Sequence, residues 1–256
     1  MRYEVTGTTM QTVSIDLARG ESLFSQTASM AWMSPTIRMD THTGGGLFAG
    51  IKRALAGGGI FITEFIADDA GHIAFAPRFP GQIVPVTLAS GQSLICRKET
   101  FLCAEKSVEL EIAFQQRLGA GFFAGEGFIM QKVTGPGTVF LDLSGEVIEK
   151  VLAPGERLLV HAGHVGMQEP SVQIDIQMMR GFRNVLFGGE GLFLATLTGP
   201  GKVWLQSMPI MNLAEEIGRY LPQNNEGGGG GGGAVVGSGV AGAAIGGILG
   251  SMFGDD

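Results

Sequence analysis

Residues 125–141 read GEGFIMQKVTGPGTVFL, and residues 189–205 read GEGLFLATLTGPGKVWL. The two stretches share a glycine elbow, GEG, a turn, TGPG, and the apolar positions on both sides of that turn. The same shift, without a gap, extends the match back to ASGQSL at residues 89–94 and APGERL at residues 153–158. Matches at a fixed spacing indicate tandem structural units. The sequence therefore predicts a chain built by repetition.

A third and more divergent copy precedes these two. ARGESL at residues 18–23 parallels ASGQSL, and LAGGGIFI at residues 55–62 parallels FAGEGFIM at residues 123–130. Its hairpin turn is Asp68-Asp69-Ala70-Gly71 in place of TGPG, which we interpret as a solvent-exposed hairpin tip. We expect three tandem units, at about residues 18–80, 89–144 and 153–208.

The repeated TGPG turn predicts a β-hairpin in each of the last two units. Proline presets φ for the second position of a turn, and the glycine after it takes the positive φ that a type II turn requires. After the turn, Val139, Leu141 and Leu143 alternate with other residues, a period of two that places one side of a strand in a core. We assign the turns structural roles, and their residues are Gly135, Pro136, Gly137, Gly199, Pro200 and Gly201.

These signals predict an all-β body over residues 1–221. A single β unit of about 60 residues has a thin core and exposed strand edges. We therefore expect three β-sandwich-like repeats in a pseudo-threefold arrangement. A short C-terminal helix is expected at residues 212–221, with Asn212 as its N-cap, Glu215 completing a capping box and Pro222 ending it. We expect this helix to cover a sheet edge.

The composition narrows the function classes. The hydrophobic content of 45% is enough for a substantial core, and the net charge of −7 with scattered Lys and Arg argues against nucleic-acid binding. Two cysteines, Cys96 and Cys103, are too few for a disulfide framework and have no zinc-site spacing. The N-terminal residues alternate polar and apolar side chains and do not resemble a signal peptide. A cytoplasmic protein is the expectation.

Residues 222–256 form a glycine-rich tail. NNEGGGGGGG has the composition of a flexible linker, and residues 234–253 contain no charge. Small residues recur there at the four-residue spacing that lets helices approach closely in a bilayer. These residues are Ala234, Ser238, Gly242, Gly246 and Gly250. Three interpretations stay open: a disordered or self-associating tail, contact with a membrane that would place the protein at the periphery of the inner membrane, and docking on the body.

The chain resembles a known family in GGEGLF at residues 188–193, TGPGKVWLQS at residues 198–207 and EPSV at residues 169–172. These motifs are similar to those of the "altered inheritance of mitochondria" (mitochondrial biogenesis) family. The resemblance covers about residues 3–217. It implies three units with a fold resembling the tryptophan RNA-binding attenuator protein, and it links mitochondrial members with inner-membrane organisation. It carries over no catalytic or ligand residue, and this chain has no matching array of lysines.

Few side chains suggest chemistry. His161 and His164 are a close pair without further metal ligands at recognisable spacing, so we interpret them as turn residues with exposed imidazoles. Glu126 and Glu190 occupy one place in two copies, and we expect them to accept hydrogen bonds from backbone N–H groups in the elbow rather than act as an acid–base pair.

We therefore predict no catalytic, cofactor or metal site. The leading hypothesis is a non-enzymatic scaffold or binding protein for an unknown protein partner, with membrane contact through residues 234–253; a homo-oligomer is compatible with it. The alternative is a small-ligand or RNA-binding module that uses crevices between the repeats.

Overall fold

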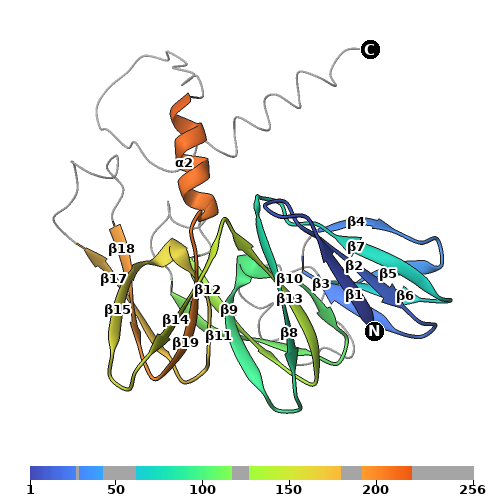
Figure 1. Cartoon of the computed structure of the whole chain (residues 1–256), viewed down its shortest axis with the longest axis horizontal. Helices are drawn as coiled ribbons and strands as arrows, with labels where there is room; N and C mark the ends of the chain where they lie inside the picture. The colour runs from blue at the N-terminus through green and yellow to red at the C-terminus, as the bar shows by residue number, and fades with distance from the viewer. Residues whose placement is uncertain (27–28, 43–61, 117–126, 180–191, 221–256) are drawn as a thin grey trace, which may run out of the picture.

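The computed structural model describes residues 1–26, 29–42, 62–116, 127–179 and 192–220 (Figure 1). These residues form four antiparallel sheets and one α-helix, so the predicted all-β class with a short C-terminal helix is confirmed. The predicted sites at Glu126, Glu190, Ser238, Gly242, Gly246 and Gly250 lie outside the described residues.

The strands follow one another in three sets of six, and one additional strand, β1 (Arg2–Thr6), precedes them. The first set is β2 (Thr12–Leu17), β3 (Ser22–Ser25), β4 (Met30–Met33), β5 (Ile37–His42), β6 (Ile62–Ala67) and β7 (Gly71–Phe75). The second is β8 (Gly81–Leu88), β9 (Ser93–Arg97), β10 (Phe101–Glu105), β11 (Glu109–Gln116), β12 (Phe128–Thr134) and β13 (Gly137–Ser144). The third is β14 (Val147–Leu152), β15 (Arg157–His161), β16 (Val165–Gln168), β17 (Gln173–Met179), β18 (Leu192–Thr198) and β19 (Gly201–Gln206).

Strand pairing has the same order in all three sets. The first, sixth and third strands pair as β2-β7-β4, β8-β13-β10 and β14-β19-β16, and the fourth, fifth and second pair as β5-β6-β3, β11-β12-β9 and β17-β18-β15. Even an irregularity recurs. The register shifts by one residue between Met30 and Trp32 in β4, between Phe101 and Cys103 in β10, and between Val165 and Met167 in β16.

Two further pairings join the sets. Strand β3 pairs with β10, and β9 pairs with β16, which produces two six-stranded sheets. A closed arrangement of three would also pair β4 with β15. Those strands instead lie at the edges of separate sheets, at opposite ends of the molecule in Figure 1. The predicted pseudo-threefold arrangement is therefore not confirmed, and the predicted unit boundaries stay a prediction.

The core has three clusters, and each strand inside a six-stranded sheet contributes to two of them. In β13, Val139, Leu141 and Leu143 are buried in one cluster, as the alternation predicts. Phe140, on the other face, is also fully buried, in a second cluster, where its ring meets Tyr3 edge-on at 5.0 Å between centroids. The prediction that only one side of this strand faces a core is wrong, because protein packs on both faces of the sheet.

The TGPG turns are tightly enclosed. A Cβ atom on Gly137, at φ +138°, would lie 2.8 Å from Ser107 Oγ, and one on Gly201, at φ +140°, would lie 2.5 Å from Ser171 Oγ. Only glycine fits there, which agrees with the predicted positive φ. The predicted hairpins are wrong, because β12 and β13 lie in different sheets, as do β18 and β19, so each TGPG segment carries the chain from one sheet to another. The type II assignment is also wrong, since the bonds from Gly135 to Pro136 and from Gly199 to Pro200 are cis.

The C-terminal helix, α2 (Ile210–Tyr220), begins two residues earlier than predicted. Asn212 lies within its first turn and is not the N-cap, because the Pro209 carbonyl accepts the backbone N–H of Asn212. Ile217 and Tyr220 are largely exposed and the helix stands away from the sheets (Figure 1), so the prediction that it covers a sheet edge is wrong. Within the part of the chain that the structure describes, no helix combines the length and the apolar character needed to span a bilayer.

Candidate functional site

His161 and His164 lie together, as the sequence predicts, at the end of β15 and in the 3-10 turn that follows it. Their ring centroids are 5.7 Å apart, and His164 Nδ1 lies 2.8 Å from the Gln206 carbonyl oxygen. Across the described ranges, no cluster of three His, Cys, Asp or Glu side chains could hold a metal ion. The two rings contact each other, and His164 also contacts β19 through the Gln206 carbonyl. Both side chains are half-buried, so the expectation of exposed imidazoles is wrong.

A buried arginine accompanies these histidines at the β9–β16 junction. Arg97 donates to Glu99 Oε2 through Nε at 3.1 Å and to the Gly163 carbonyl through Nη1 at 3.3 Å, and its guanidinium lies over the Phe128 ring. Burial lowers the pKa of His161, and the charges of His164 and Arg97 lower it further. Arg97 ties the second set to the third. The sequence analysis missed it, because one arginine in an apolar strand gives no signal of its partners.

Asp142, on β13, has a largely buried carboxyl group, and no hydrogen bond from the described residues offsets the loss of water around one of its oxygen atoms. Its Oδ1 atom is buried and has no hydrogen-bond partner among the described residues, and desolvation raises its pKa to about 7. The matching position in the third set is Gln206, which accepts from the Ser144 N–H and donates to the Gly163 carbonyl. The Gln206 amide in the third set therefore has hydrogen-bond partners, whereas the Asp142 carboxyl in the second set lacks one for Oδ1 within the described ranges.

The other candidate side chains have structural contacts. Asp68 pairs with Arg38 Nε at 3.0 Å, and Asp69 accepts the Ala70 N–H at 2.8 Å. The predicted hairpin tip is wrong, because this turn joins β6 to β7, which lie in different sheets. Cys96 and Cys103 are fully buried, and burial raises the pKa of both thiols. Neither thiol is therefore available as a thiolate nucleophile at neutral pH.

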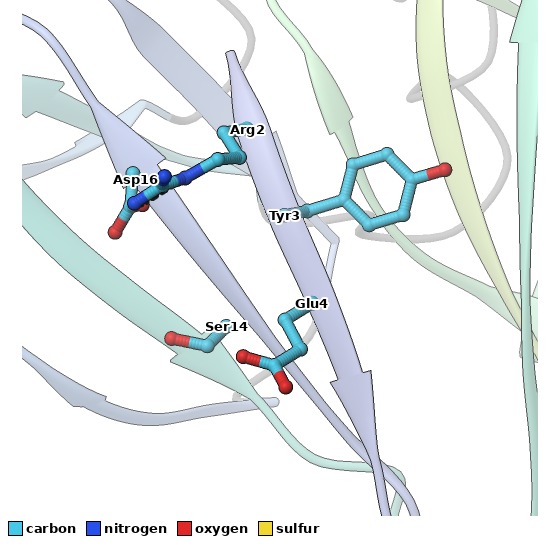
Figure 2. Close-up of a pocket in the computed structure, with 5 residues that line it drawn as sticks. All are labelled: Arg2, Tyr3, Glu4, Ser14 and Asp16. Carbon is cyan, nitrogen blue, oxygen red and sulfur yellow. Dashed lines mark hydrogen bonds and ion pairs between the residues drawn. The ribbon is translucent and has the colours of Figure 1, made fainter.

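A shallow surface depression marks the place where β1 pairs with β2. Figure 2 shows Arg2, Glu4, Ser14 and Asp16 on one face of the two strands and Tyr3 pointing to the other side. Arg2 Nη2 lies 2.8 Å from Asp16 Oδ2. The depression is thus the solvated side of a strand pair, and it shows how an added strand covers the outer edge of β2.

Among the described residues, no strand pairs along the outer edge of either matching strand, β8 or β14. Met10 makes one bridge to Gly81 in β8, and Gln11 Oε1 accepts the Ile83 N–H. Pro85, also in β8, has no N–H and so makes that edge a poor site for another strand. On β14, no strand among the described residues pairs with the outer edge.

Exposure of the β14 side chains follows from this difference. Val13 in β2 is fully buried, whereas the matching residue in β14, Ile148, is 44% exposed. Val151 is 72% exposed, at the position where β2 has Asp16 bonded to Arg2. We therefore take the outer edge of β14, residues 147–152, as the candidate functional site. The sequence analysis missed it, because edge status depends on which strands pair.

Charged and aromatic groups flank this edge. Glu149 accepts hydrogen bonds from Lys202 Nζ at 3.0 Å and from Trp204 Nε1 at 2.8 Å, both on β19. The hydrogen bond from Lys202, followed by that from Trp204, lowers the pKa of the Glu149 carboxyl. Lys150, between the two exposed apolar residues, is itself exposed and supplies a positive charge at the edge.

Comparison with known proteins places these features in a family. The model of the mitochondrial biogenesis AIM24 family matches residues 3–208. The chain belongs to this family. The predicted family is thus confirmed, and the likeness to the tryptophan RNA-binding attenuator protein stays a prediction.

Two bacterial proteins are similar to this AIM24 family member along most of their length. One is an uncharacterised protein of Streptococcus pyogenes serotype M6 (strain ATCC BAA-946 / MGAS10394), 29% identical over 221 residues. The match covers 83% of this chain and 88% of that protein. The other is a Streptococcus pyogenes protein with an X-ray crystal structure, 27% identical, with a TM-score of 0.70 over 86% of this chain and 99% of that one. Neither relative's description states an activity.

The raised pKa of Asp142 makes the stability of this AIM24 family chain depend on pH. The folded chain keeps a proton on Asp142 up to about pH 7, and the unfolded chain loses it near pH 4, so stability falls as pH rises between these values. We expect Asp142→Asn to raise the free energy of unfolding by about 2–4 kcal/mol near pH 8 and to have little effect near pH 4. Urea denaturation near pH 8 and near pH 4 measures the free energy of unfolding of the variant and the parent chain.

Asp16→Asn is the matched control, because Asp16 is exposed and forms a surface ion pair with Arg2. Its effect should stay below about 1 kcal/mol at both pH values. His161, whose lowered pKa acts in the opposite direction by favouring the folded state as pH rises through its titration range, is unchanged in both variants and cancels in the comparison. Equal unfolding free energies for Asp142→Asn and the parent near pH 8 would refute the prediction.

Proposed function

We propose that this protein is a non-enzymatic scaffold that binds an extended segment of a protein partner along the outer edge of β14. The exposure of Ile148 and Val151 on an edge strand carries this proposal, because the matching edge of β2 is covered by β1. Added strands bind through main-chain hydrogen bonds, and alternate side chains provide specificity.

The β1–β2 pair indicates what the segment would contact. Tyr3 lies opposite Ile15 and Val5 opposite Val13, on the face that points to the core, while Arg2 lies opposite Asp16. By position, Lys150 takes the place of Ile15, Ile148 that of Val13, and Val151 that of Asp16. A fitting segment therefore carries apolar residues opposite Ile148 and Val151 and an acidic residue opposite Lys150.

The environments of the polar side chains support a binding protein over an enzyme. Arg97 and Gln206 make hydrogen bonds between two sets of strands, His164 bonds within the third set, and both thiols are buried. The depression beside β1 carries Glu4 and Asp16, which disfavour the phosphates of RNA. We propose a cytoplasmic body that contacts the periphery of the inner membrane through residues 234–253.

Photo-crosslinking tests the β14 site in cells. Val151 is replaced by p-benzoylphenylalanine in the full-length chain, and Thr87, the matching residue on the Pro85-containing strand β8, receives the same replacement as the control. We expect an adduct with a different protein from position 151, at least about tenfold stronger than from position 87, and expect Ile148→Lys to abolish it. Equal adducts from both positions, or none from position 151, would contradict the proposed site.

Flotation with lipid vesicles tests the membrane contact. The twenty uncharged residues 234–253 could insert into a bilayer, so the full-length chain should float, whereas a version ending at Pro222 should not. Gly246→Asp, which places a charge in the middle of this stretch, should reduce flotation. The membrane part of the proposal fails if the full-length chain stays with the soluble fraction or if the shortened version floats equally well.

A further inference from the structure

The two junctions inside the chain show how one set of strands joins the next. At the first, Ala104 pairs with Phe24 and Glu105 with Leu23, antiparallel, and Ser25 Oγ donates to the Leu102 carbonyl at 2.7 Å. At the second, Gln168 pairs with Ile95 and Met167 with Cys96, also antiparallel. In each case the second strand of one set meets the third strand of the following set.

The register is the same at both junctions. Because the bulge recurs in the third strand of every set, Ala104 in β10 corresponds to Gln168 in β16 and to Met33 in β4. On the second strands, Phe24 in β3 corresponds to Ile95 in β9 and to Leu159 in β15. Ala104 with Phe24 and Gln168 with Ile95 are therefore one pairing, present twice.

A third copy of this junction is left unmade at the two ends of the molecule. Strand β4 has the third position of the first set, β15 has the second position of the last set, and both are outer strands of their sheets. They lie at opposite ends in Figure 1, so they do not meet within one chain.

The outer strands β4 and β15 expose large apolar side chains at positions that are buried in the internal junctions. Trp32 is 50% exposed, although the matching residues, Cys103 and Met167, are fully buried where a neighbouring set covers them. Leu159 is 65% exposed, and the residue that matches it in the first junction, Phe24, is fully buried. Strand β4 carries no charged residue and no proline. Strand β15 carries one charged residue, Arg157, at its first position, two residues before Leu159.

We propose that a second copy of this chain occupies these edges, with β15 of one molecule pairing antiparallel with β4 of the next. Leu159 then lies opposite Met33, and Val160 opposite Trp32, as the two internal junctions dictate. The joined strands β17-β18-β15-β4-β7-β2 repeat the order of both six-stranded sheets, with β1 added at one end. The contact is head to tail, so it forms a ring where the rotation closes and a filament where it does not.

This assembly does not depend on the proposed function, because it uses β4 and β15 and leaves β14 free. An Ile148→Lys variant should therefore assemble like the parent chain, while its form with p-benzoylphenylalanine at position 151 should lose the partner adduct. Loss of assembly in variants of Trp32 or Leu159, with the adduct retained, would separate the two activities in the other direction.

Sedimentation velocity of the full-length chain tests the contact. The parent chain should form species at multiples of the 26.8 kDa mass of one chain, and Trp32→Lys and Leu159→Lys should each reduce the assembled fraction at least about tenfold. Both substituted side chains are exposed, so circular dichroism should show an unchanged fold. A parent chain that sediments as a single copy at about 100 µM, or variants that assemble like the parent, would overturn the proposal.

Mixing the two variants tests the head-to-tail geometry. Trp32→Lys keeps an intact β15 and Leu159→Lys keeps an intact β4, so an equimolar mixture should form a complex of two chains and nothing larger. Assembly of either variant alone would indicate another contact, such as one between tails, and would overturn the assignment. A mixture that stays monomeric would do the same.

A cross-link tests the register without altering charge. In the Met33→Cys, Leu159→Cys double variant, mild oxidation should give a ladder of disulfide-linked chains on a non-reducing gel, since the native Cys96 and Cys103 are buried. The Met33→Cys, Val151→Cys pair is the control and should remain a single chain. Equal ladders, or none in either variant, would overturn the register.

Discussion

Backbone pairing between the second strand of one set and the third strand of the next is the interaction on which the structure depends. Without the β3–β10 and β9–β16 pairings, each set would have two three-stranded sheets with exposed edges. A small unit of this kind buries too little apolar surface to be stable alone. The junctions turn these small sheets into six-stranded ones, and strands such as β13 thereby acquire protein on both faces.

The same constraint explains which surfaces remain for interaction. An edge strand exposes unpaired N–H and C=O groups, and the protein treats its edges differently. The outer edge of β2 is covered by β1, β8 carries Pro85, and β14 keeps exposed apolar side chains. At the two ends, β4 and β15 are complementary to each other. In the functions that we propose, the outer edge of β14 binds a partner, and the outer edges of β4 and β15 bind second copies of the chain.

Sequence reasoning reached the elements that local chemistry determines. The repeated TGPG segment predicted glycines with positive φ after the prolines, and both have it, at places where Ser107 and Ser171 also leave no room for a side chain. The hairpins predicted there are absent from the described strands, because the strands on the two sides of each TGPG segment pair in different sheets. Sequence reasoning could not predict the buried position of Phe140 or the exposure of Ile148. Each of these depends on which strand lies next in a sheet, and an apolar strand reads alike whether it is central or at an edge. The helix begins two residues earlier than predicted, because the Pro209 carbonyl accepts the backbone N–H of Asn212 and places Asn212 inside the first turn.

Backbone amide hydrogen exchange, followed strand by strand as a function of protein concentration, measures the central claim most directly. Amides of β9, which is paired inside the chain, should be protected equally at about 1 µM and about 100 µM, while the outward amides of β15 should become protected only at the higher concentration. That result is the one predicted if all three junctions are the same interaction and the third forms between chains. Outward amides of β15 that exchange freely at every concentration, or that are as protected as those of β9 in dilute solution, would contradict it.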